Sequence, residues 1–253
     1  MNKIREIWAA GGTAVVGWLQ VPSALSAESL ARCGYDGLVL DLQHSPIDYA
    51  TAVEMITAIE VGGTLPMARL AANEAGEVMK LLDSGALGII VPMIESAAEA
   101  ERFASALHYP PRGSRSFGPR RPALKHGSAY HSIASNTFVS FAMIETAQGI
   151  RNLDEILATD GIDGVFIGPS DLALALGRPP APDSSDSLVV ETIRHIRERA
   201  HAAGKRAGIF CVDPVFARAK AAEGFDLVSL ASDLSLLTRA ATDSLAQMRG
   251  PVS

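Results

Sequence analysis

The chain has 253 residues, a net charge of −6 and a hydrophobic content of 48%. This length is close to the roughly 250 residues of one (β/α)₈ barrel, and the composition is that of an ordinary globular protein with ample core. The acidic balance argues against nucleic acids and anionic membrane surfaces as partners. No stretch reaches the roughly 18 apolar residues of a membrane span, and the start lacks the apolar core of a signal peptide.

Eight apolar runs alternate with segments of helical periodicity, after a short amphipathic helix in the first twelve residues. Runs of this kind predict strands. The predicted strands cover residues 13–20, 36–43, 65–70, 87–94, 138–145, 162–168, 205–210 and 225–231. Many of the helical segments end in a glycine, which readily takes the left-handed conformation that stops a helix. These glycines are Gly34, Gly62, Gly85, Gly161, Gly204 and Gly224.

Uniformly apolar strands that alternate with helices predict a parallel sheet buried on both faces. Eight such units and no second domain favour a single closed (β/α)₈ barrel over residues 1–253. An open doubly wound sheet is the alternative. The two cysteines, Cys33 and Cys211, lie far apart and make no disulfide framework. A reducing cytoplasm is therefore the expected location.

One long stretch, residues 109–136, is predicted to be irregular because it is rich in Pro, Arg, Ser and Gly. A loop of this length inside a compact domain is usually functional or lies at an interface. We interpret it as a segment that orders at a subunit contact, or that covers the site and attracts an anionic substrate. A plain solvated loop is the alternative. Its arginines are Arg112, Arg115, Arg120 and Arg121.

In a (β/α)₈ barrel the reactive groups lie at the C-terminal ends of the strands. Trp18 and Gln20 end the first predicted strand, Gln43 and His44 follow the second, and Phe210 ends the seventh. A histidine at such a position can act as a general base near neutral pH. A plain hydrogen-bonding role is the alternative for this loop residue.

Two carboxylates, Glu145 and Asp171, follow the fifth and sixth predicted strands, which are neighbours in a barrel. Like charges after apolar runs repel each other and are costly to desolvate, and a shared cation removes both problems. Carboxylate oxygens, waters and a chelating substrate suit Mg²⁺ or Mn²⁺. The alternative is that the two residues act independently, as helix caps or in surface ion pairs.

Arg69 ends an otherwise apolar strand, so an inward-facing guanidinium there needs an anionic partner. That anion is either a substrate carboxylate or enolate, or a protein carboxylate: Glu145, Asp41 or Asp83. The turn of Gly168, Pro169 and Ser170 comes before a helix start, where backbone N–H groups can hold a carboxylate or phosphate.

The lysines bear on the reaction type, because a Schiff-base aldolase needs a lysine in its site. None lies at the C-terminal end of a predicted strand, so an aldolase with this sequence needs a metal as its electron sink. The chain also has no Walker sequence and no glycine-rich dinucleotide motif after a strand. The lysines are Lys3, Lys80, Lys125, Lys205 and Lys220.

The motifs DLQHSP, MARL, KLLDSG, IIVPMIES, YPPRGSRSFGPRR, AMIETAQG and GVFIGPSDLALALG follow one another along nearly the whole chain. In this order they resemble the HpcH/HpaI aldolase family of metal-dependent pyruvate aldolases. The last two motifs are the most specific. The resemblance is greatest to the hydroxyketoacid and 4-hydroxy-2-oxoheptanedioate types.

The resemblance implies a role for each matching residue. Glu145 and Asp171 would bind the metal, which is Mg²⁺ or Mn²⁺ with Co²⁺ as a further candidate. Arg69 would bind the keto oxygen and stabilise the enolate, and His44 would move the proton of the aldol hydroxyl, supported by Asp83. The backbone around Gly168 and Ser170 would hold the pyruvate carboxylate. Trp18, Gln20, Gln43, Pro169 and Phe210 complete the predicted substrate site.

The predicted reaction is the reversible cleavage of a 4-hydroxy-2-oxo acid to pyruvate, or hydroxypyruvate, and an aldehyde. The resemblance also implies a homohexamer, a trimer of dimers, with loop residues that cross between subunits. Asp83 ends a helix before the fourth strand, on the rim opposite the site, so it could reach His44 only across a subunit contact. Two alternatives remain: a carbon–carbon lyase acting on a CoA thioester, as in the related citrate lyase group, and a non-catalytic barrel that binds oxo acids.

Overall fold

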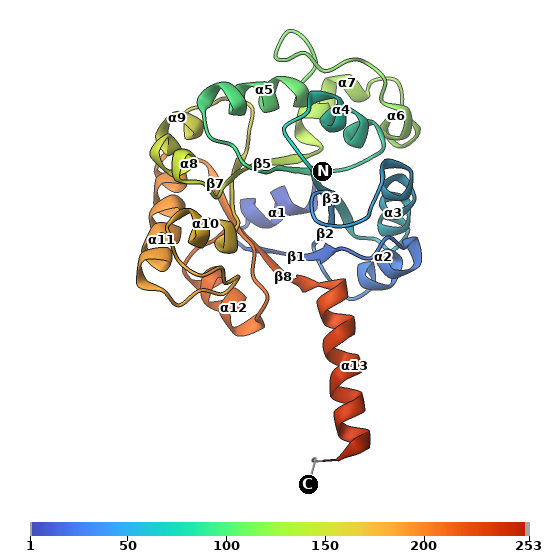
Figure 1. Ribbon diagram of the computed structural model, residues 1–253. Helices are drawn as coiled ribbons and strands as arrows, with labels where there is room; N and C mark the ends of the chain where they lie inside the picture. The colour runs from blue at the N-terminus through green and yellow to red at the C-terminus, as the bar shows by residue number, and fades with distance from the viewer. Residues whose placement is uncertain (1, 251–253) are drawn as a thin grey trace.

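The computed structural model describes residues 2–250, and its centre is a closed barrel of eight parallel strands in sequential order (Figure 1). Closure confirms the predicted barrel and excludes the open sheet. All eight predicted strands are present. They are β1 (Ala14–Leu19), β2 (Gly37–Asp41), β3 (Leu65–Arg69), β4 (Gly88–Val91), β5 (Val139–Ile144), β6 (Gly164–Ile167), β7 (Arg206–Ile209) and β8 (Leu227–Ser232).

Helices surround the barrel, and most of them begin with a residue whose side chain accepts a hydrogen bond from the first turn, as at Ser23, Asp48 and Ser96. The helices are α1 (Lys3–Ala9), α2 (Ala24–Ala31), α3 (Tyr49–Val61), α4 (Ala75–Asp83), α5 (Ala97–Leu107), α6 (Arg120–His126), α7 (Tyr130–Ile133), α8 (Ala147–Arg151), α9 (Leu153–Leu157), α10 (Pro169–Ala175), α11 (Ser187–Ala202), α12 (Pro214–Ala222) and α13 (Asp233–Arg249), with a 3₁₀ turn, η1 (Ala134–Asn136).

Two local expectations were wrong. Residues 109–136 are not irregular throughout, because α6, α7 and η1 form within them. The last turn of α6 contains the basic residues Lys125 and His126, which are favourable at a helix C-terminus. The high Pro and Gly content of the stretch obscured this signal. After α3, the left-handed residue is Gly63, with a φ of 84°, whereas Gly62 keeps an ordinary φ of −69°.

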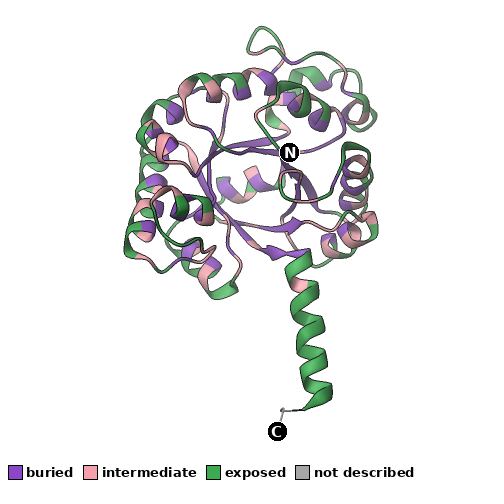
Figure 2. Cartoon of the chain, in the orientation of Figure 1, coloured by how far each residue is buried: buried purple, intermediate pink, exposed green. Residues whose placement is uncertain are grey.

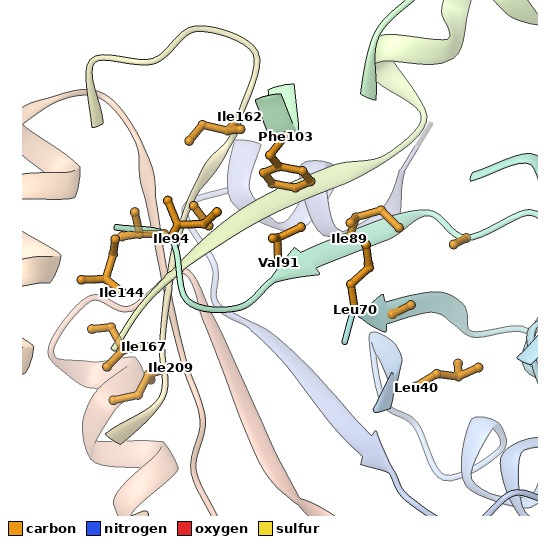
Figure 3. Packing of buried hydrophobic residues seen from close by; sticks show 14 of the residues in the cluster. Leu40, Leu70, Ile89, Val91, Ile94, Phe103, Ile144, Ile162, Ile167 and Ile209 are labelled. Carbon is orange, nitrogen blue, oxygen red and sulfur yellow. The ribbon is translucent and has the colours of Figure 1, made fainter. Parts of the chain in front are cut away.

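The apolar core has two parts, one inside the barrel and one between the strands and the helices. The inner part stacks side chains such as Val39, Met67 and Phe141, and α1 closes its N-terminal end with Ile4 and Trp8. The outer part is larger. Figure 3 shows it around Val91, Ile144, Ile167 and Ile209, with Phe103 packed above. A filled interior leaves chemistry to the rim, as in other barrels of this kind.

The last helix, α13, departs from the ring of helices and projects away from the barrel (Figures 1 and 2). From Leu234 to its end its side chains are exposed, apart from the half-buried Leu236, and several of them are apolar. Four large ones recur on one face at helical spacing: Leu234, Leu237, Leu245 and Met248. Within residues 2–250, no helix is both long and apolar enough to cross a membrane.

Candidate active site

A cavity of about 190 Å³ opens at the C-terminal ends of the strands. Nine of the predicted site residues line it, together with two residues that the sequence analysis did not include, Met143 and Phe166. The predicted lining residues are Trp18, Gln20, His44, Arg69, Gly168, Pro169, Ser170, Asp171 and Phe210. The barrel rule therefore predicted that these residues gather at one rim, because each lies at the end of a strand or within four residues after it.

Arg69 is held by a carboxylate of the neighbouring strand. Its Nε donates to Oδ1 of Asp41 at 3.0 Å, and its Nη2 donates to Oδ2 at 2.7 Å. The two residues are direct register partners at the ends of β2 and β3. A two-bond pair of this kind fixes the plane of the guanidinium. Of the three carboxylates predicted as possible partners of Arg69, Asp41 is the one that pairs with it.

Asp41 is fully buried and belongs to a wider network. The side-chain amide of Gln20 donates to its Oδ2 at 3.2 Å, and the backbone N–H of His44 donates to Oδ1 at 3.1 Å. Burial alone would raise the pKa of Asp41, but the charge and hydrogen bonds of Arg69, with those of His44 and Gln20, lower it below its ordinary value. The carboxyl thus remains ionised and keeps Arg69 in place. From the sequence, Asp41 was predicted only as one possible partner of Arg69, although it ends β2 as Arg69 ends β3.

Aromatic rings form one wall of the cavity. The Arg69 guanidinium lies 5.1 Å from the centre of the Trp18 ring, a cation–π distance. The edge of Trp18 meets Phe210 with 5.2 Å between centroids, and Phe166 lies 5.7 Å away on another side. Apolar walls beside a fixed cation suit a small substrate with one anionic and one apolar end.

Glu145 is 2% exposed, and only one of its two carboxylate oxygens is hydrogen-bonded within residues 2–250. Its Oε1 accepts the backbone N–H of Met93 at 2.9 Å, whereas its buried Oε2 finds no hydrogen-bond partner in this part of the chain. Met93 reaches this position in the left-handed region, with a φ of 55°, which is uncommon for a residue with a side chain. Burial, and to a lesser extent the charge of Asp171, raise the pKa of Glu145 to about 7.

Gly168 and Asp171 complete this corner of the site. A Cβ on Gly168 would lie 2.5 Å from Oε2 of Glu145, so only glycine leaves that oxygen room. Pro169 is the first residue of α10, and Asp171 lies in its first turn, exposed to the cavity mouth. An orphaned carboxylate oxygen with a second carboxylate close enough to affect its pKa fits a hard divalent cation with oxygen ligands.

Three of the predicted site residues, His44, Gln43 and Asp83, lie in different surroundings. His44 is exposed and lines the cavity, anchored through its backbone to Asp41. Gln43 gives only its backbone N–H to Asp41, at 3.2 Å, and does not line the cavity. Asp83 lies at the opposite rim, at the end of α4, where its carboxylate pairs with Arg115 at 2.7 Å. Within one chain it does not reach His44.

The rim of the barrel carries two carboxylates, a guanidinium of fixed orientation and an apolar wall. These are features of an enzyme that acts on small carboxylic acids. Residues 15–240 match the model of the family described as HpcH/HpaI aldolase/citrate lyase. The chain belongs to this family. It is an aldolase, and therefore a carbon–carbon lyase.

The chain is similar to curated and solved relatives over nearly its full length. It is 57% identical to a hydroxypyruvate/pyruvate aldolase of Rhizorhabdus wittichii, over 98% of this chain and 99% of that one. It is 35% identical to a 5-keto-4-deoxy-D-glucarate aldolase of Escherichia coli O157:H7, over 97% and 95% respectively. A crystal structure of a family protein from Burkholderia cenocepacia superposes with a TM-score of 0.91 at 28% identity, covering 99% of this chain and 100% of that one.

The raised pKa of Glu145 predicts how stability depends on pH when no metal is bound. The carboxyl titrates near 4.5 in the unfolded chain and near 7 in the folded one, so the folded state binds more protons between these values. Its contribution to stability is therefore complete below about pH 4.5 and lost as pH rises through 7. In chelator, Glu145→Gln should raise the melting temperature at pH 8 and change it little at pH 4.5, as followed by circular dichroism. An equal effect at both pH values would contradict the assignment.

Proposed function

We propose that the protein catalyses the reversible aldol cleavage of 4-hydroxy-2-oxo acids to pyruvate, or hydroxypyruvate, and an aldehyde, with a divalent cation held by Glu145 and Asp171. The observation that carries this proposal is the buried, unpartnered Oε2 of Glu145 beside a second carboxylate. The names of the two curated relatives, a hydroxypyruvate/pyruvate aldolase and a keto-deoxy-glucarate aldolase, support the substrate class.

Mg²⁺ or Mn²⁺, or alternatively Co²⁺, would supply Lewis acidity to the carboxylate and keto oxygens of a bound 2-oxo acid. Glu145 and Asp171 would hold the ion. Because Met93 engages only Oε1 of Glu145, Oε2 is the oxygen left for this role. Gly168 keeps that oxygen accessible by having no side chain.

Arg69 would bind the keto oxygen and stabilise the charge that develops there as the enolate forms. A donor fixed before the reaction stabilises a developing charge without having to reorganise. Asp41 fixes it through two hydrogen bonds, and the Trp18 ring supports it from the side. The backbone at Gly168 and Ser170 would receive the substrate carboxylate, since both residues line the cavity beside Asp171.

His44 would take the proton of the 4-hydroxyl as the C3–C4 bond breaks, and return it in the direction of synthesis. Its exposed position at the cavity mouth suits exchange of that proton with solvent. Asp83 would support His44 only from a second subunit. The aldehyde would lie against Phe210, Trp18 and Phe166, with Gln20 as the nearest side-chain amide, whereas Gln43 would act only through its backbone.

A homohexamer, a trimer of dimers, is our proposal for the assembly. The exposed apolar stripe of α13 supports it, because a contiguous apolar helix face is normally buried against a partner. We keep a cytoplasmic location as a prediction.

The metal requirement is tested by chelation. Excess chelator should abolish aldol cleavage, and Mg²⁺, Mn²⁺ or Co²⁺ should restore it, because the paired carboxylates are then neutralised again. Asp171→Asn should weaken metal binding, measured by calorimetry, while circular dichroism remains unchanged. Glu191→Gln, which alters an exposed carboxylate on α11 that does not line the cavity, is the matched control. Full turnover in excess chelator would rule out the metal-dependent mechanism.

Replacement of Arg69 tests its role in forming the enolate. Arg69→Ala should lower kcat by about 10² to 10³, the usual effect of losing one fixed donor. It also leaves Asp41 buried without its partner, which costs about 3–5 kcal/mol of stability. The double variant Asp41→Asn/Arg69→Ala should recover much of that stability but no turnover. The readouts are exchange of pyruvate methyl protons by NMR and the melting temperature. Near-normal exchange in a folded Arg69→Ala protein would refute the role.

The assembly is tested on α13 with two matched pairs of substitutions. Leu237→Asp/Leu245→Asp charges the apolar stripe and should break the hexamer into smaller species, as measured by light scattering after size exclusion. Ala246→Asp/Gln247→Asp charges the other side of the same helix and should leave the mass unchanged, because these exposed residues lie off the stripe. A monomeric parent protein, or an equal response of both pairs, would contradict the proposed role of α13.

A further inference from the structure

The pairing between the end of β1 and β8 is irregular, because β8 has one extra residue there. Val16 pairs with Ser229, but Trp18 pairs with Ser232, so two residues of β8 lie opposite the single residue Gly17. One of these two, Ala231, has a φ of 53°, an uncommon conformation for alanine. A bulge of this kind bends its strand and changes the direction of the residues that follow it. Here the residue that follows the strand is Asp233.

Asp233 is 3% exposed, and its carboxylate faces the end of β1. Oδ1 accepts the backbone N–H of Gln20 at 2.7 Å, and Oδ2 accepts that of Val21 at 3.2 Å. The hydroxyl of Ser26 lies 3.5 Å from Oδ2. Among residues 2–250, no Lys, Arg or His forms an ion pair with Asp233. A buried charge satisfied mainly by backbone N–H groups is costly and fixes those groups strongly.

Capping of α13 does not account for this carboxylate. Ser232 is already the N-cap, and it forms a reciprocal capping box with Ser235. Among residues 2–250, the only hydrogen bond that the Asp233 carboxylate accepts from its own helix comes from the N–H of Leu234, at 2.8 Å. Its closer hydrogen bonds outside the helix come from Gln20 and Val21 in the loop that follows β1, and a longer one comes from Ser26 in α2. Its position therefore serves mainly that loop.

A short chain of hydrogen bonds leads from Asp233 to the active site. Asp233 holds the backbone of Gln20, and the side-chain amide of Gln20 donates to Oδ2 of Asp41 at 3.2 Å. The same Oδ2 accepts Nη2 of Arg69 at 2.7 Å. Asp233 itself does not line the cavity, whereas Gln20 and Arg69 do.

We propose that Asp233 is a positioning residue of the aldolase site, which orients Arg69 through Gln20 and Asp41. The bulge in β8 brings its carboxylate to the N–H of Gln20; that contact sets the direction of the Gln20 side chain, and Gln20 holds the side of Asp41 that receives Nη2 of Arg69. This inference rests on the proposed function, because it assumes that Arg69 stabilises the enolate.

A double-mutant cycle tests the path. Asp233→Asn should lower kcat for aldol cleavage by about tenfold with little change in KM, because small misplacements of a group that acts in the transition state are costly. In a Gln20→Ala background the same substitution should change kcat by less than about twofold, whereas a residue that acts independently of Gln20 would repeat the tenfold loss. Exchange of pyruvate methyl protons should follow the same pattern.

Asp36→Asn is the matched control. The Asp36 carboxylate accepts the N–H of Val15 at 2.9 Å, so it holds β1 at the other end of the strand. This substitution should lower the melting temperature but leave kcat unchanged. If Asp233→Asn does not fold, Asp233→Glu, which keeps the charge and displaces the oxygens, should give a smaller loss that Gln20→Ala again cancels.

The outcomes separate the two proposals. A parent protein without aldol cleavage or proton exchange would refute the proposed function itself. With an active parent, an unchanged kcat in folded Asp233→Asn would overturn the positioning role. An equal loss with and without the Gln20 side chain would overturn it as well, because Asp233 would then act by another route.

Discussion

The burial of the Glu145 carboxylate is the physical constraint on which the rest of the proposed site depends. The Glu145 side chain is almost inaccessible, but among residues 2–250 only one of its oxygens has a hydrogen-bond partner. Burial of an incompletely satisfied charge is expensive and raises the pKa of Glu145. The N–H of Met93 and, to a lesser extent, the charge of Arg69 offset this cost only in part. Gly168 keeps side-chain atoms away, and Asp171 brings a second negative charge.

The charged residues at the mouth of the barrel form two pairs, one of opposite charges and one of like charges. Arg69 and Asp41 neutralise each other through two hydrogen bonds. The charge of Asp171 raises the pKa of Glu145 more than the charge of Arg69 lowers it. Within residues 2–250, neither Glu145 nor Asp171 forms an ion pair with a Lys, Arg or His, whereas Arg69 is held by Asp41. This division accords with the proposed chemistry, in which an oxo acid meets a metal on one side and a fixed donor on the other.

Sequence alone predicted the eight strands, because each is a uniformly apolar run. It also predicted nine residues that line the cavity, because residues at the end of such a run lie at the C-terminal rim of a barrel. It could not choose the partner of Arg69 among three carboxylates, since register between strands is a tertiary property. Nor could it foresee that Met93, at a φ of 55°, donates its N–H to Glu145. No composition signal marks a non-glycine residue for that conformation.

Asp233 shows why a site of this kind extends beyond the residues that line it. It was not among the predicted residues, because its importance follows from a bulge in β8 that has no signature in a pattern of apolar residues. Asp233 is also the first residue of α13, the helix whose apolar face is exposed. Any contact that buries this face restrains the helix, and with it the carboxylate that holds Gln20. In the proposed assembly, the helix that would join subunits begins three hydrogen bonds from Arg69, so assembly and the orientation of the guanidinium would depend on the same carboxylate, that of Asp233.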